Sequence, residues 1–226
     1  MRLSILLLAI LALPAVAQPT PEVEALERAA RLDQQTADAW VRVGRAAQSS
    51  DDSAAEFAFM RAHQIDAGNS EALAGLASLA FEQAKATQDA VVRAKRFTKA
   101  EIWYRELLRV DPARKTAHYS LGVIEWEHFY PAFARKRASL AVNPKAAGPL
   151  ADAGARAELR RFFASSIERA IAPLKTALVI DPDYIEAMLQ LNLLYRVKAD
   201  VEDSLEESQY DISCSTAHLR LARGHR

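Results

Sequence analysis

Residues 100–125, AEIWYRELLRVDPARKTAHYSLGVIE, decide how this chain folds. A small residue, Ala100, is followed four residues later by Tyr104 and three residues after that by Leu107, before Asp-Pro at 111–112. Steps of three and four residues place these side chains on one face of a helix. Because a proline disfavours helical backbone in the residue before it, one helix should end at the Asp-Pro pair and another should begin.

The first half of this stretch recurs along the chain as small, large, small or apolar residue, then Asp or Asn. Its other copies are Leu26, Ala29 and Asp33; Ala55, Phe59, Ala62 and Asp66; Ala132 to Leu140 with Asn143-Pro144; and Ala170, Leu174, Ala177 and Asp181-Pro182. The turns near residues 33, 66, 111, 143 and 181 are 33, 45, 32 and 38 residues apart. A pattern that returns at such intervals indicates a repeat architecture.

The second half, which follows each turn, joins a large residue to an apolar and small pair three residues later. Its copies are Trp40, Val43-Gly44 and Ala47; Leu73, Leu76-Ala77 and Ala80; His118, Leu121-Gly122 and Glu125; Leu150, Ala153-Gly154 and Ala157; and Met188, Leu191-Asn192 and Tyr195. Small residues at a crossing let two helices approach closely. Hairpins of this size cannot bury their own apolar faces, so they must stack on one another.

Together the two phrases resemble the tetratricopeptide repeat (TPR), whose unit has about 34 residues. The resemblance covers nearly all of residues 18–226. It implies an all-α, right-handed solenoid of stacked antiparallel hairpins, with about five repeats and an N-terminal half repeat. About eleven extra residues near Gln83–Lys99 have helix-forming composition and predict lengthened helices rather than a loop.

Three features of the sequence depart from a regular series of helical hairpins. Pro131 and Pro173 should each kink or end the helix that contains them. The stretch 203–226 has weak periodicity, so we expect it to be divergent or partly disordered. A terminal repeat is often atypical because its outer face meets water.

The N-terminus has the pattern of an export signal. Arg2 is followed by an apolar run from Leu3 to Leu13, and the small residues Ala15 and Ala17 form a cleavage motif. A membrane anchor is the rival interpretation, but residues 1–17 fall short of the roughly 20 apolar residues that span a bilayer. We therefore expect a cleaved signal peptide at 1–17, a periplasmic or secreted mature chain from 18 to 226, and no integral membrane span after cleavage.

The charge balance argues against a nucleic-acid partner, and the lack of catalytic motifs argues against an enzyme. Lys plus Arg and Asp plus Glu number 29 each, so no net field attracts nucleic acid. No Gly-rich phosphate loop, Gly-x-Ser-x-Gly elbow or Cys-x-x-Cys pair occurs, and Cys214 is a lone thiol. Glu125 and His128 have a metal-like spacing, but no second copy exists and a solvated helix face is favoured. The sequence thus predicts no enzyme activity, no cofactor and no metal.

What remains is a binding surface on the first helix of each repeat. Carried over from the TPR pattern, the concave positions are Val41, Arg45, Gln48, Ala74, Ser78, Phe81, Thr116, Tyr119, Val123, Trp126, Leu189, Leu193 and Arg196. The Lys, Asn and Arg set with which peptide-binding TPR proteins hold a C-terminal carboxylate is absent. We instead predict a groove with Phe81, Tyr119 and Trp126 rimmed by Arg45 and Arg196, since aromatics and Arg often dominate binding energy. The alternative is that these aromatics pack against neighbouring helices.

Three functional hypotheses follow from these observations. The leading one is a protein-protein interaction scaffold or adaptor of the cell envelope, which binds an unidentified protein or peptide in the concave groove. The second is a self-associating structural protein, a homo-dimer formed by stacking of terminal units. The third, an enzyme built on the Glu125–His128 helix, has the least support.

Overall fold

The computed structural model describes residues 21–32, 36–140, 150 and 152–224, and this part of the chain forms helices and turns with no strand. In chain order the helices are α1 (Pro21–Leu32), α2 (Ala37–Ala47), α3 (Asp52–Ile65), α4 (Ser70–Ala86), α5 (Ala90–Val110), α6 (Lys115–Ser139), α7 (Ala153–Ile180), α8 (Ile185–Ala199) and α9 (Leu205–Gly224). The all-α prediction is confirmed.

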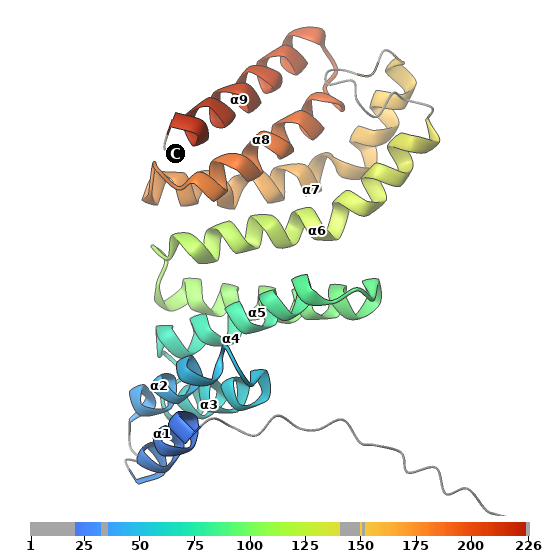
Figure 1. Cartoon of the computed structure of the whole chain (residues 1–226). Helices are drawn as coiled ribbons and strands as arrows, with labels where there is room; N and C mark the ends of the chain where they lie inside the picture. The colour runs from blue at the N-terminus through green and yellow to red at the C-terminus, as the bar shows by residue number, and fades with distance from the viewer. Residues whose placement is uncertain (1–20, 33–35, 141–149, 151, 225–226) are drawn as a thin grey trace, which may run out of the picture.

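These helices stack as a solenoid of hairpins. The most extensive contacts join α2 to α3, α4 to α5, α6 to α7 and α8 to α9, and each hairpin also contacts the next. Figure 1 shows the helices ascending in chain order from α1 to α9. The described residues therefore form four hairpins preceded by the single helix α1, where the sequence predicted about five repeats and a half repeat.

The difference between the observed number of hairpins and the predicted number of repeats arises between residues 115 and 180. The predicted turns near 143 and near 33 lie outside the described residues. Helix α6 has 25 residues and runs through Pro131, and α7 has 28 residues and runs through Pro173. The repeat copy that begins at Ala132 therefore extends α6 instead of opening a new hairpin.

Aromatic packing explains why α6 continues past its proline. Phe129 and Phe133, on either side of Pro131, are 5% and 1% exposed, and both contact the ring of Phe163 in α7. A proline inside a helix removes one backbone hydrogen bond and kinks the helix. Helix α6 is visibly bent in Figure 1 and remains continuous.

The inserted residues near Gln83–Lys99 lengthen α4 and α5, as predicted. Only residues 87–89 separate the two helices. Asp89 caps α5, because its carboxylate accepts hydrogen bonds from the backbone N–H groups of Val91 at 2.8 Å and Val92 at 2.9 Å. The insertion is therefore helical, and it packs as part of the α4–α5 hairpin.

Close helix approach depends on small residues, as the repeat pattern implies. The ring of Phe59 in α3 is 1% exposed and lies between Gly44 of α2 and Gly75 of α4. A Cβ atom at Gly44 would lie 2.6 Å from the ring, and one at Gly75 would lie 2.5 Å from it. Phe59 thus fills the space that the two glycines leave open.

The C-terminal stretch contains α9, which docks on α8 through a polar face. Its buried residues include Ser208, Asp211 and Ser215. Asn192 donates to the hydroxyl of Ser215 at 2.7 Å, and Lys198 donates to Asp211 at 3.1 Å. Burial raises the pKa of the Asp211 carboxyl to about 6, although the neighbouring Lys198 ammonium acts to lower it.

No helix in the described part of the chain is both long enough and apolar enough to cross a membrane.

Candidate binding groove

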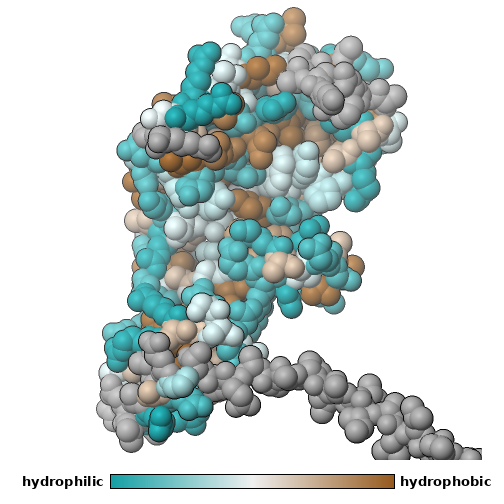
Figure 2. Space-filling model, viewed as in Figure 1, coloured by the Kyte–Doolittle hydropathy of each residue, from teal (hydrophilic) through white to brown (hydrophobic). Residues whose placement is uncertain are grey.

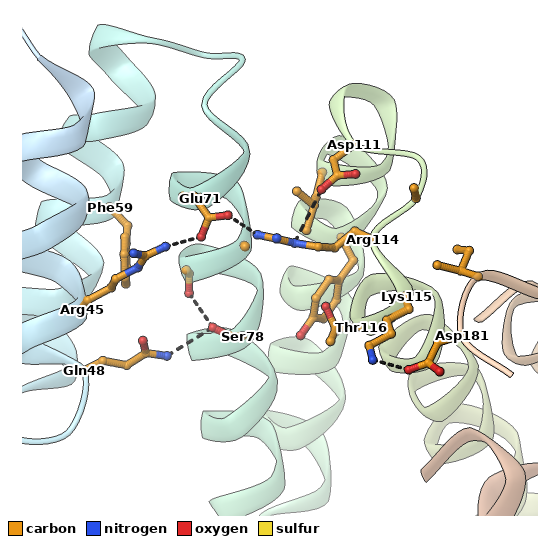
Figure 3. A pocket seen from close by; sticks show the side chains of 16 residues that line it. Arg45, Gln48, Phe59, Glu71, Ser78, Asp111, Arg114, Lys115, Thr116 and Asp181 are labelled. Atoms are coloured by element: carbon orange, nitrogen blue, oxygen red, sulfur yellow. Dashed lines mark hydrogen bonds and ion pairs between the residues drawn. The ribbon is translucent and has the colours of Figure 1, made fainter. Parts of the chain in front are cut away.

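The first helices of three successive hairpins, α2, α4 and α6, line a groove of about 800 Å³. Figure 3 shows polar side chains reaching into it from these helices and from the turns at Asp111 and Asp181. Small residues of α4, Ala74 and Gly75, border the groove, and the buried ring of Phe59 lies beneath. Five of the thirteen predicted concave positions line this groove: Arg45, Gln48, Ala74, Ser78 and Thr116.

Helical spacing brings the polar groups of the groove together. Arg45 lies in the last turn of α2 and Gln48, three residues later, is the C-cap of this helix, while Glu71, Ala74 and Ser78 follow three-and-four spacing on α4. The amide of Gln48 donates to the hydroxyl of Ser78 at 3.2 Å, so this contact links the first hairpin to the second.

Glu71 is the electrostatic centre of the groove. Its carboxylate accepts hydrogen bonds from Arg45 of α2 and from Arg114, which reaches back at 2.6 Å from the turn before α6 (Figure 3). Hydrogen bonding from Arg114 outweighs burial and, together with Arg45, lowers the pKa of Glu71 below its ordinary value. One carboxylate thus connects three hairpins.

A second ion pair closes the other end of the groove. Lys115 donates to Asp181, which lies in the turn after α7. The hydrogen bond from Lys115, with a further one from the backbone N–H of Asp183 at 3.0 Å, lowers the pKa of Asp181. Asp111 also lines the groove, 3.7 Å from Arg114, so the described residues give it three cations and three carboxylates, all partly exposed to a partner.

Of the five predicted site residues, Arg45 lies in the groove. Arg196 is exposed on α8 and is not among the side chains that line it. Phe81 is a correction, because its ring is 6% exposed in the core and packs 5.7 Å from Phe97 and 6.2 Å from Tyr104. The lengthened α5 supplies Phe97, which is part of the reason that Phe81 is covered.

Tyr119 and Trp126 are half-buried and pack against other aromatic rings. Tyr119 contacts Tyr184 of the last hairpin at 5.4 Å between ring centroids. Trp126 stacks on Tyr130 at 4.0 Å and contacts Phe129 at 5.7 Å. Neither side chain lines the groove, and both pack against the hydrophobic core of the last two hairpins.

Sequence reasoning missed five charged residues that line the groove: Glu71, Asp111, Arg114, Lys115 and Asp181. The turn phrase offered a signal, since Arg114 and Lys115 directly follow Asp-Pro-Ala and Asp181 opens the next Asp-Pro pair. Residues at such turns lie at one end of the hairpins, where they can reach the neighbouring repeat.

No metal-binding arrangement of three His, Cys, Asp or Glu side chains is found in the part of the chain that the structure describes. Glu125, half of the metal-like pair, accepts hydrogen bonds from Arg169 of α7 at 2.7 and 3.0 Å. His128 is exposed, with its ring 6.4 Å from that of Phe97. The pair therefore has structural contacts in place of a ligand set.

Comparison with known proteins bears on the fold. No protein-family model matches the sequence, and no curated protein matches it. A crystal structure of MamA is 13% identical with a TM-score of 0.55, covering 88% of this chain and 86% of that one. The MamA RS-1 ArsTM double mutant, also 13% identical, has a TM-score of 0.56 and coverages of 88% and 83%. The fold is TPR-like.

A further solved structure is that of YrrB, a TPR protein with an unusual peptide-binding site. It is 17% identical, covers 89% of this chain and 97% of that one, and has a TM-score of 0.41. The likeness to MamA shows the fold alone, and that to YrrB carries no argument, so a ligand for the groove must be argued from this chain's own residues.

Proposed function

We propose that this protein is a non-catalytic interaction scaffold of the cell envelope, which binds an extended peptide segment of a partner protein in the concave groove. The observation behind the proposal is the groove itself, to which three successive hairpins contribute exposed charges and hydroxyls. The stacked hairpins meet their ordering cost on folding, so the groove is already shaped before a partner arrives.

The groove suits a segment that carries both signs of charge. Glu71 and Asp181 offer carboxylate oxygens, while Arg45, Arg114 and Lys115 offer N–H donors. Each internal ion pair is partly exposed, and such pairs stabilise a protein by only about 0–1 kcal/mol. A partner can therefore replace these pairs at small cost, with its own acidic groups on the Arg side chains and its basic groups on the carboxylates.

The test is selection of binders from a displayed library of random peptides, followed by titration of the selected peptides. Arg114→Gln should weaken binding about tenfold, since a charge-assisted hydrogen bond contributes roughly 1.5–3 kcal/mol. Arg105→Gln is the matched control, because Arg105 pairs with Glu101 outside the groove. Selected peptides that bind the parent and the Arg114 variant equally would place the binding surface elsewhere.

Export is part of the same proposal. It is supported by the apolar run Leu3–Leu13 and the Ala15-x-Ala17 motif. Mass spectrometry of the protein recovered from its native envelope should find Gln18 as the first residue. Recovery of intact residues 1–17 on the protein would support the anchor interpretation in place of a cleaved signal.

Self-association through α9 is a second candidate function. Leu205, Tyr210 and Leu221 are large apolar residues on this last helix and are 61%, 68% and 54% exposed. A terminal helix with such residues could stack on a second copy. Light scattering across a hundredfold range of concentration distinguishes the two candidates, because a constant monomer mass excludes a dimer.

A further inference from the structure

A second cleft lies between α5 and α6, at the two places where the chain departs from a 34-residue repeat. One wall is the N-terminal part of the lengthened α5, with Arg93 and Phe97, and the other is the middle of the bent α6, with His128, Pro131 and Arg135. Its volume is about 500 Å³. Figure 2 shows the surface hollowed on the side where α6 turns away from α5.

Helix periodicity explains why these side chains share the cleft. Arg93 and Phe97 are four residues apart on α5, and His128, Pro131 and Arg135 follow steps of three and four on α6. Each set therefore occupies one face of its helix, and the two faces oppose each other. The repeat pattern alone would not produce this cleft, since it needs both the inserted turns of α5 and the passage of α6 through Pro131.

The cleft has an excess of positive charge. Arg93 is partly buried and Arg135 is exposed, and neither makes an ion pair with any residue that the structure describes. The nearby Arg96 differs, because it donates to the carbonyl of Gln83 at 3.0 Å and to Thr87 at 2.6 Å. Among the described residues that line the cleft, Glu127 is the one carboxylate, against two guanidinium groups.

The wall beside these charges is apolar and aromatic. Phe97 is 2% exposed, and its ring meets the ring of His128 edge to face at 6.4 Å. Pro131 and small side chains of α5 complete the surface. A space of about 500 Å³ falls in the range of roughly 300–1,000 Å³ typical of pockets for small molecules.

We propose that this α5–α6 cleft binds a small organic anion, a carboxylate or phosphate monoester carried on an apolar body. Arg93 and Arg135 hold the anionic head from opposite walls, and the apolar body rests against His128, Pro131 and the small side chains of α5, above the buried ring of Phe97. Guanidinium groups suit either head, because their planar fork matches both carboxylate and phosphate geometry. This binding is independent of the concave groove and of a peptide partner.

Calorimetric titration of the purified protein with four probes tests the proposal. The probes are benzoate, phenyl phosphate, inorganic phosphate and uncharged benzyl alcohol. Benzoate or phenyl phosphate, or both, should bind at one site at millimolar concentration or below, and the stronger of the two identifies the head group. Inorganic phosphate should bind about tenfold more weakly than phenyl phosphate because it lacks the apolar body, and benzyl alcohol should not bind.

Four variants locate the site. Arg93→Gln and Arg135→Gln should each weaken binding of the organic anion about tenfold, whereas Glu127→Gln should strengthen it several-fold by removing a repelling charge. Lys95→Gln, an exposed cation of α5 outside the cleft, is the matched control and should leave binding unchanged. The proposal is wrong if neither organic anion binds at millimolar concentration, if the Arg93 and Arg135 variants retain the parent's affinity, or if inorganic phosphate binds as tightly as phenyl phosphate.

Discussion

Gly44 offers the sharpest test of how the repeat pattern produces close helix packing. A Cβ atom at this position would lie 2.6 Å from Cε1, 2.7 Å from Cδ1 and 2.9 Å from Cζ of Phe59. All three distances are shorter than van der Waals contact. The ring has little room to move away, because it also packs closely on Gly75 of α4, where a Cβ atom would lie 2.5 Å from Cε1.

The magnitude of the effect follows from two opposing terms. Gly→Ala inside a helix ordinarily stabilises by about 1 kcal/mol, whereas an extra methyl group in a packed core costs about 1–3 kcal/mol. Because the added methyl group would lie too close to three ring atoms, its cost should fall in the upper part of the range of about 1–3 kcal/mol. Gly44→Ala should therefore lower the free energy of unfolding by ~1–2 kcal/mol.

The assay is urea unfolding followed by circular dichroism for the four members of a double-mutant cycle with Phe59→Leu. Leucine lacks the Cε and Cζ atoms, so in the Phe59→Leu background Gly44→Ala should keep only its helix gain of about 1 kcal/mol, which gives a coupling energy of ~2–3 kcal/mol. Gly224→Ala is the control, since a Cβ there meets nothing within 4 Å. If Gly44→Ala stabilises the parent, or if its cost is the same in both backgrounds, the packing argument is refuted.

Three further predictions concern other parts of the solenoid. Gly122→Ala should lower the free energy of unfolding by ~1–3 kcal/mol, because the added Cβ would lie 2.9 Å from the backbone oxygen of Ala170, and urea unfolding measures it. Asp89→Ala should cost ~1 kcal/mol by the same assay through loss of the cap on α5. The pKa of Asp211 is raised from 3.8 to about 6, so the folded state binds more protons than the unfolded state between these values, and stability should fall as pH rises from 4 to 6. Thermal melts should show this slope in the parent and a smaller one in Asp211→Asn; equal slopes would contradict the assignment.

The hairpins could be predicted from sequence because their signals are local. An Asp at 66, 111 and 181 directly follows the last residue of a helix, and its N–H bonds back to the carbonyl four residues earlier. Turn chemistry and three-and-four spacing therefore suffice to place these elements. The long α6 could not be predicted in this way, because its continuation depends on residues distant in sequence.

Magnitudes show why helix α6 continues past Pro131. A proline in a helix interior costs about 3 kcal/mol, while full burial of one Phe side chain contributes roughly 1.5–3 kcal/mol. Phe129 and Phe133 are both buried against α7, so together they offset the cost of the proline. Nothing within residues 129–133 reveals that Phe163 will be there to pack on them.

The position of the groove was predicted from the sequence, but only some of the residues that line it were. Arg45 follows from the helix position alone, whereas Glu71 and Arg114 meet only because α4 and the turn before α6 come together in space. Phe81 was wrongly placed in the groove for a related reason. Its covering partner, Phe97, lies in an insertion whose packing the repeat pattern does not describe.

Site-specific photo-crosslinking in the native envelope tests the central claim most directly, that the concave groove holds a partner segment. A photoreactive amino acid replaces Ser78 or Thr116 in the groove, or, as a control, Thr98 or Arg105 outside it. The account predicts adducts to one partner protein from the two groove positions and none from the control positions. Adducts from Thr98 or Arg105 with none from Ser78 and Thr116 would contradict it.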